Sequence, residues 1–249
     1  MMIKYLFIQF FKRKRFKILI QKILNKFSLE DKNNTDIKWL NSYKTSWEEY
    51  LKSMDLQLFD ETREVIDELI KENKKKLKKL DVKLGGSANQ FLLYFLIRKF
   101  KPSVIFETGV AAGHSSRAIL KALKTNQKGK LYSSDFPYFR IKNSEKYIGI
   151  LVEEELKEIW HLSIEGDSIN IKEFLKIENT IDFFHYDSDK SYKGKQSTYN
   201  LVKKKISKGG IFIFDDIQDD NFFRDITTQN NFNFNVFSFE NKYVGLINF

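Results

Sequence analysis

The feature that most constrains the fold is an alternation of short apolar runs with helical segments after residue 100. The runs at 104–107, 181–186 and 211–214 are rich in Val, Ile and Phe and show no regular polar alternation. Strands of this kind are buried on both faces, which is typical of a parallel sheet covered by helices on each side. The sequence therefore predicts an α/β fold with a doubly wound, mostly parallel sheet.

The same pattern predicts the individual elements of this sheet. Helices are expected at 89–100, 115–123, 144–158, 169–175 and 192–206, and strands at 104–107, 131–134, 160–164, 181–186 and 211–214. At the end of the chain, the aromatic runs 232–239 and 243–249 flank a short polar turn. These two runs predict an antiparallel hairpin that closes the sheet.

The chain divides by composition into three regions: a basic arm at 1–27, a helical extension or cap at 28–84, and the α/β domain at 85–249. In the extension, the aromatic and Leu residues between Trp39 and Leu51 are spaced for one buried helix face. A charged helix is expected to follow from Asp60 to Leu80. The 249 residues include no cysteine, which excludes thiol chemistry and zinc bound by cysteine.

The basic arm carries most of the excess charge. It has eight Lys or Arg residues and no acidic residue, so the net charge of +10 falls to +2 when the arm is set aside. Because the remainder has no distributed basic stripe, we do not expect a nucleic-acid partner. Residues 16–27 form a basic amphipathic pattern that suits a membrane surface, but a helix docked on its own domain or on a second subunit is the commoner use of such a pattern. A homo-oligomer is therefore compatible with the sequence.

The expected location is the cytoplasm, with the inner face of a membrane as the option that the arm leaves open. No apolar run approaches the roughly 18 residues of a spanning helix. The first residues also lack the charged start and small-residue cleavage site of a signal peptide.

Acidic residues follow all five predicted parallel strands. Ligands of open α/β sheets bind at the carboxyl ends of the strands, so these positions are candidates for a binding site. The positions are Glu107 with the turn Gly109 to Gly113, Asp135, Asp167, Asp187 and the pair Asp215 and Asp216. Each carboxylate alone suits a helix N-cap. Five in series would repel one another at a single sheet edge unless a ligand or cation offset their charge.

The motifs at these positions resemble those of class I S-adenosylmethionine-dependent methyltransferases, which have a Rossmann-like sheet. They are ETGVAAGHSS at 107–116, LYSSDFP at 131–137, GDS at 166–168, FHYDSDKSY at 184–192 and GGIFIFDDI at 209–217. The resemblance covers about 85–249 and implies S-adenosylmethionine as cofactor. It assigns the methionine side to Glu107, Gly109 and Gly113, the ribose to Asp135, and the adenine to Asp167 and Ser168. From their position at the start of the next helix, Ser115 and Ser116 could cap that helix or bind a ligand carboxylate. The loop departs from the fuller glycine pattern at Ala111.

A narrower resemblance is to the cation-dependent O-methyltransferases. It implies that Asp187, Asp215 and Asp216 bind Mg²⁺ or Mn²⁺ and that Lys190 is the catalytic base beside Asp187. Oxygen ligands suit these two ions, and a bound cation would orient and acidify a substrate hydroxyl. Asp216 departs from the family pattern, which has Asn there, and related bacterial enzymes often carry His at the position of Lys190.

The leading hypothesis is O-methylation of a hydroxylated small molecule or sugar. The alternative is a non-catalytic binding module or membrane-associated scaffold that keeps the methyltransferase fold, because a fold by itself does not determine function.

Overall fold

The computed structural model describes residues 36–249, except 83, 85, 139–140 and 142. The basic arm, its predicted amphipathic helix and Gly85 lie outside the described residues. Within the described part of the chain, no helix is both long and apolar enough to cross a membrane.

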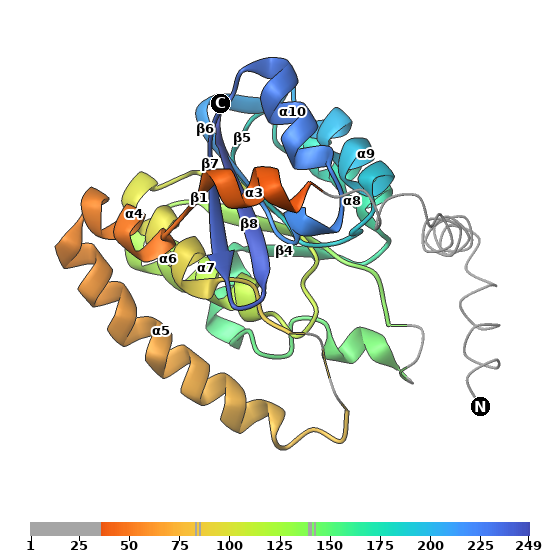
Figure 1. The fold of residues 1–249 in the computed structure, drawn as a ribbon. Helices are drawn as coiled ribbons and strands as arrows, with labels where there is room; N and C mark the ends of the chain where they lie inside the picture. Colours follow the sequence, from red (N-terminus) through yellow and green to blue (C-terminus); the bar gives the residue numbers. More distant parts are fainter. Residues whose placement is uncertain (1–35, 83, 85, 139–140, 142) are drawn as a thin grey trace.

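The centre of the molecule is an eight-stranded sheet with the order β1-β7-β8-β6-β5-β2-β3-β4 (Figure 1). Its strands are β1 Lys44–Thr45, β2 Val104–Thr108, β3 Lys130–Ser134, β4 Trp160–Ser163, β5 Ile181–Tyr186, β6 Ile206–Phe214, β7 Asn233–Phe239 and β8 Lys242–Asn248. Strands β2 to β6 are parallel, whereas β8 pairs antiparallel with both β6 and β7. The predicted parallel sheet with a closing antiparallel hairpin is confirmed. The order reverses between β5 and β2, which is where ligands of such sheets bind.

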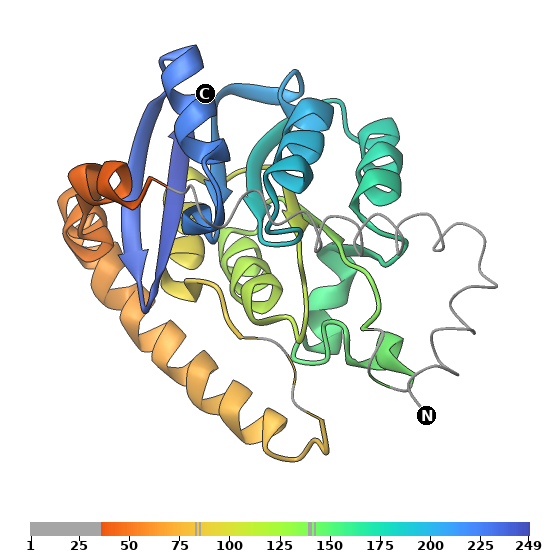
Figure 2. The same cartoon turned by 45° about the vertical axis from the view of Figure 1, so that its right-hand side comes forward.

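Helices cover both faces of the sheet (Figure 2). They are α3 Ile37–Tyr43, α4 Trp47–Met54, α5 Leu56–Leu77, α6 Gln90–Phe100, α7 His114–Asn126, α8 Asp167–Ile177, α9 Tyr192–Val202 and α10 Phe222–Asn230. Alternate strand residues enter different cores: Ile105 and Phe183 pack with α4 to α7, and Phe106 and Phe184 pack with α3 and α8 to α10. Both kinds of strand position are apolar because both faces are buried.

The predicted helix at 144–158 is wrong. The structure has two short 3₁₀-helices there, η1 Ser144–Tyr147 and η2 Glu154–Ile159. Between them, the backbone N–H of Gly149 donates to the carbonyl of Ala111 at 2.9 Å, and that of Leu151 donates to Ala112 at 3.0 Å. These amides bind the loop after β2, so they are not available to a continuous helix.

Two further expectations need correction. The helix expected at 192–206 ends at Val202, and β6 begins at Ile206 rather than 211. The aromatic residues between Trp39 and Leu51 do not share one face: Trp39 stacks on Phe234 in one core, and Trp47 packs on Phe91 in the other. The unexpected strand β1 separates α3 from α4 by pairing with β7 at the edge of the sheet.

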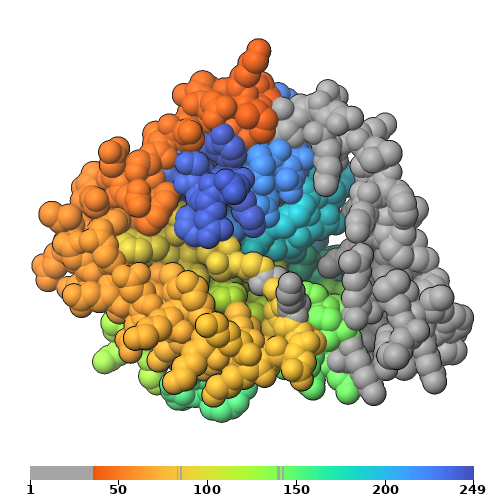
Figure 3. Space-filling view, turned by 60° about the horizontal axis from the view of Figure 1, so that its bottom comes forward, coloured from red at the N-terminus to blue at the C-terminus, as the bar shows by residue number. Residues whose placement is uncertain are grey.

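The helices of the extension pack directly on the α/β part. In Figure 3, α4 and α5 (orange) form a continuous surface beside the hairpin β7–β8 (blue). Leu51 of α4 and Ile66 of α5 are buried in the same core as α6 and α7. The division of the chain into 28–84 and 85–249 stays a prediction.

Lys195 of α9 is the buried cation on which the turn after β6 depends. Its ammonium forms a 2.7 Å ion pair with Asp220 and donates to the carbonyl of Asp216 at 2.8 Å. Neither side chain of the ion pair is more than 1% exposed. The turn contains Asp216 at a φ of +53° and the 3₁₀-helix η3 Ile217–Asp219.

We expect Lys195→Met to lower the free energy of unfolding by about 3–5 kcal/mol, because it leaves Asp220 buried without its ion-pair partner. Urea unfolding of the two proteins measures this difference. Lys193→Met, on the exposed side of the same helix, serves as the matched control and should change stability by less than about 0.5 kcal/mol. Equal stability of the two variants would contradict the role given to Lys195.

Candidate functional site

The loop between β2 and α7, residues 109–113, lies at the reversal point of the strand order and is called the glycine loop below. Gly109 has a φ of +85°, and a Cβ atom there would lie 2.0 Å from the carbonyl oxygen of Asp187. A side chain is therefore excluded at Gly109 by both backbone conformation and space. The loop passes directly against the end of β5. Ala111 takes a left-handed φ of +50°, so the turn closes although this position is not glycine.

Asp135 supports the glycine loop. Its Oδ2 atom accepts hydrogen bonds from the backbone N–H groups of Val110 at 3.1 Å and Ala111 at 2.7 Å. Its Oδ1 atom accepts from the N–H of Phe136 at 2.6 Å. The residue expected to bind a ribose thus lies at the loop, and in this arrangement its carboxylate binds the loop amides.

Glu107 is buried beneath the loop. Its Oε2 atom accepts hydrogen bonds from the hydroxyls of Ser116 at 2.6 Å and Ser133 at 2.7 Å. Gly113 is the N-cap of α7 and no side chain caps the helix, so neither Ser115 nor Ser116 has the capping role. Ser115 is buried in the first turn of α7. Glu107 therefore connects β2, β3 and α7 underneath the loop.

The third candidate position lies at the ends of β3 and β4. Asp167, the first residue of α8, accepts from the hydroxyl of Ser134 at 2.6 Å, and Ser168 is exposed. Sequence reasoning missed Asn170, which is fully buried. Its amide donates to Ser134 Oγ and to the Ser163 carbonyl, both at 2.9 Å, and accepts from Ser163 Oγ at 2.7 Å. A polar residue one turn into a helix gives no local signal for such a role.

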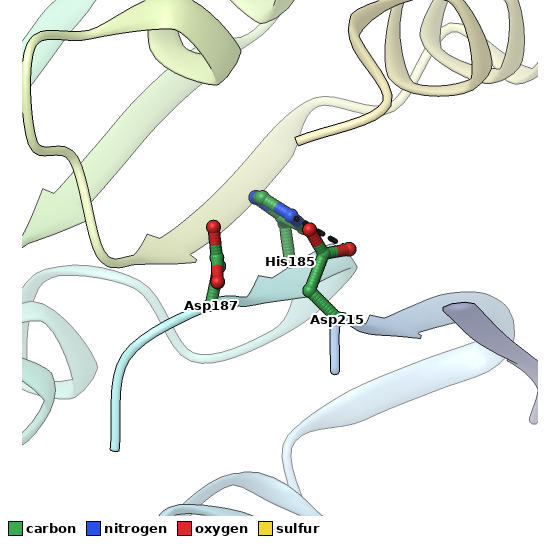
Figure 4. Close-up of side chains that lie close together, drawn as sticks. All are labelled: His185, Asp187 and Asp215. Atoms are coloured by element: carbon green, nitrogen blue, oxygen red, sulfur yellow. Dashed lines mark ion pairs between the residues drawn. The ribbon is translucent and has the colours of Figure 1, made fainter. Parts of the chain in front are cut away.

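Asp187 and Asp215 lie together at the ends of β5 and β6, with His185 beside them (Figure 4). One possible ligand atom from each of the three residues lies within 4.8 Å of the others. His185 is fully buried, with Nε2 3.6 Å from Asp215 and Nδ1 3.7 Å from Glu107. Both distances exceed a hydrogen bond. Neither ring nitrogen has a hydrogen-bond partner among the described residues.

The ionisable groups of this cluster shift one another's pKa values. Burial would lower the pKa of His185, but the nearby carboxylates of Asp215 and Glu107 outweigh it and raise the pKa to about 10. Burial raises the pKa of Asp187 to about 6, and the charge of Asp215 adds to this effect. The site concentrates negative charge that His185 and Lys190 offset.

Lys190 lies between two of the expected metal ligands. Its ammonium is paired with Asp187 and, at 2.5 Å, with Asp216. Burial opposes the charged form of Lys190, but the two carboxylates outweigh it and raise its pKa. A lysine that acts as a general base needs a lowered pKa. While both carboxylates face Lys190, its ammonium neutralises their charge and does not act as a base. Asp216 also pairs with Lys242 at 3.3 Å and is not among the residues whose possible ligand atoms gather around His185.

We expect Gly109→Ala to destabilise the protein by more than about 3 kcal/mol, because the backbone of Asp187 occupies the space of the new methyl group. Gly209→Ala is the control: Gly209 has a similar φ of +79° with nothing within 4 Å of the added Cβ. It should show only the conformational cost of about 1 kcal/mol. Thermal and urea unfolding separate the two. Similar losses would show that the contact between the loop and β5 is not tight.

The comparisons with known proteins agree with this geometry. Residues 106–217 match the family model of a methyltransferase domain. A search of curated protein sequences finds no match.

Solved structures of low sequence identity share the fold. An O-methyltransferase from Bacillus cereus in complex with SAH aligns with a TM-score of 0.53 at 11% identity, covering 84% of this chain and 100% of that one. A Staphylococcus aureus protein, provisionally described as a caffeoyl-CoA O-methyltransferase, gives 0.54 at 13% identity, covering 81% and 99%. The SAH-bound methyltransferase PaMTH1 from Podospora anserina gives 0.53 at 13%, covering 84% and 92%. Residues 106–217 therefore match a methyltransferase domain, and the chain shares the fold of these solved methyltransferases.

Proposed function

We propose that the protein transfers a methyl group from S-adenosylmethionine to a hydroxyl oxygen of a small molecule or sugar, assisted by a divalent cation. One observation carries this proposal: the glycine loop contacts the backbone of Asp187, whose side chain belongs to the cluster of His185, Asp187 and Asp215. A cofactor on the loop and an acceptor at the cluster would then be neighbours.

The cofactor site of this proposal follows the strand ends. Gly109, Gly113 and Ser115 line the amino-acid end, where the first turn of α7 offers backbone N–H groups to an anion. Asp135 and the pair Asp167 and Ser168 line the nucleoside end. Glu107 serves as support through Oε2, which accepts from Ser116 and Ser133, whereas its Oε1 has no hydrogen-bond partner among the described residues.

The donor set of the cluster fits a divalent cation. Asp187 and Asp215 supply carboxylate oxygens, and His185 supplies a buried ring nitrogen that has no partner among the described residues. Two carboxylates suit Mg²⁺ or Mn²⁺, and an imidazole in the set favours Mn²⁺. Asp216, the third expected ligand, would have to leave Lys190 and Lys242 to join them. We therefore assign Asp187, Asp215 and His185 as the ligands, with His185 releasing its proton when the cation binds.

The proposed methyl transfer depends more on the relative position of the two reactants than on removal of the proton from the hydroxyl group. A cation held by these residues would lower the pKa of a substrate hydroxyl and fix its position. Correct positioning of two reactants contributes roughly 7–11 kcal/mol, compared with roughly 3–5 kcal/mol from a general base. Asp187 and Asp215 should therefore matter more than Lys190, which holds Asp187 and Asp216 in place.

The first test is Mn²⁺ binding, measured by calorimetry. Asp215→Asn should weaken binding at least 10-fold because it removes a charged ligand, whereas Lys190→Met should bind as well as the unchanged protein or better. Asp219→Asn, in the same turn but outside the cluster, is the matched control and should bind normally. Equal binding by the Asp215 and Asp219 variants would rule out the cation site.

S-adenosylhomocysteine binding tests the cofactor assignment in the same instrument. The unchanged protein should bind it, and Asp135→Ala should bind at least 10-fold more weakly because the loop loses its support. Cofactor binding without Mn²⁺ binding would leave a metal-independent methyltransferase. Binding of neither would favour the alternative, a non-catalytic module that keeps this fold.

A further inference from the structure

A buried polar cluster connects α5 to the helix that follows the glycine loop. It consists of Asn73 of α5 and of His114 and Arg117 of α7, and Asn73 and Arg117 are each about 1% exposed. Arg117 also pairs with Glu72 and with Glu153, whose oxygens accept from Nε at 2.9 and 3.0 Å. Nothing in the proposed chemistry uses these residues, although His114 directly follows the loop and Arg117 lies one turn further along α7.

Arg117 determines how the amide of Asn73 is oriented. Its Nη1 atom donates to Asn73 Oδ1 at 2.6 Å. A guanidinium has only donors, so the Asn73 atom that faces it must be the oxygen. The Nδ2 atom then points the other way, where it lies 3.2 Å from His114 Nδ1 and 3.3 Å from Gln90 Oε1.

The orientation of Asn73 determines the tautomer of His114. Because Asn73 Nδ2 is a donor, His114 Nδ1 must accept and carries no proton. Burial, aided by the positive charge of Arg117, lowers the pKa of His114. The ring is thus neutral near pH 7 and its single proton is on Nε2. In the part of the chain that the structure describes, no hydrogen bond occupies Nε2, and His114 is partly exposed.

The position of His114 suggests what its free N–H binds. It is the first residue of α7 and follows Gly113, which caps that helix without a side-chain hydrogen bond. The backbone amides of the first turn and the Nε2–H group together favour a negatively charged acceptor. On S-adenosylmethionine the only such group is the carboxylate of its amino-acid end.

We propose that Arg117 and Asn73 hold His114 as the Nε2–H tautomer and that this group donates a hydrogen bond to the cofactor carboxylate. The inference rests on the proposed cofactor site. His114 becomes a cofactor-binding residue, and Asn73 and Arg117 become positioning residues. The helical extension would then complete the cofactor site through α5 as well as covering the core.

The tautomer can be measured without any ligand. The chain has only three histidines, so ¹⁵N–¹H correlation spectra resolve each ring, and His114→Ala identifies the signals of His114. We expect the proton on Nε2 in the unchanged protein. In Asn73→Asp, where no N–H faces the ring, the proton should move to Nδ1 or the ring should become doubly protonated. A proton on Nδ1 in the unchanged protein would overturn the proposal.

S-adenosylhomocysteine binding by calorimetry tests the donor role. His114→Ala should bind about 10-fold more weakly, as expected for loss of a hydrogen bond to a charged group. At a pH where the spectra show a single proton on Nδ1, Asn73→Asp should lose a similar factor, and the double variant should lose no more than His114→Ala alone, because both act through one group. Glu72→Gln, which touches Arg117 through a half-exposed carboxylate, is the matched control and should keep both the tautomer and the affinity.

The outcomes separate this inference from the proposed function. Normal affinity in His114→Ala, with binding by the unchanged protein, would overturn the donor role and leave the methyltransferase assignment intact. A loss in Asn73→Asp without a change of tautomer would show that Asn73 acts only through packing, which would also overturn the proposal. Absence of binding by the unchanged protein would overturn the cofactor site and this inference together.

Discussion

The register of the parallel strands is the constraint on which the rest of the site depends. The ladder continues one residue beyond the strand ends: the N–H of Gly109 donates to Ser134 and that of Asp187 donates to Thr108, both at 2.9 Å. The N–H of Asp135 donates in the same way to Ser163, and that of Asp215 to Tyr186. The loops that follow these strands are far apart in the chain, but they therefore leave the sheet at the same level. A shift of one residue would turn their side chains to the opposite face.

This arrangement gathers charge in a place that water scarcely reaches. Glu107, His185 and Asp215 are buried at the end of the sheet, and Lys190 lies against two more carboxylates. Such groups are tolerated only when each faces an opposite charge or a donor. The serines that donate to Oε2 of Glu107 and the ion pair of Lys195 and Asp220 meet this requirement, whereas Oε1 of Glu107 has no hydrogen-bond partner in the part of the chain that the structure describes. Among the described residues, the two ring nitrogens of His185 have no hydrogen-bond partner, and this is where a cation or substrate would bind.

The helical extension is coupled to the same region from the outside. Helix α5 contacts α7 through Asn73 and Arg117, and Glu153 connects Arg117 to the segment that binds the carbonyls of the glycine loop. Movement of α5 would therefore change the loop and the first turn of α7 together. The break in the expected helix at 144–158 has the same origin, because its amides serve the loop.

The sequence by itself determined the elements whose signal is local. The apolar runs of β2, β5 and β6 and the aromatic hairpin β7–β8 specified strands, because burial on both faces leaves a composition that can be seen without neighbours. The glycine loop and the acidic residues at the strand ends could also be identified from the sequence, because each is defined by residues that are adjacent in the chain.

Only the tertiary structure decided which of these residues meet. The edge strand β1, the separation of Trp39 from Trp47 and the support given by Asn170 all depend on partners far along the chain. So do the pairing of Asp216 with Lys190 and the inclusion of His185 in the cluster with Asp187 and Asp215. Periodicity reports whether a side chain is buried, whereas the identity of its neighbour is set by strand register and helix packing.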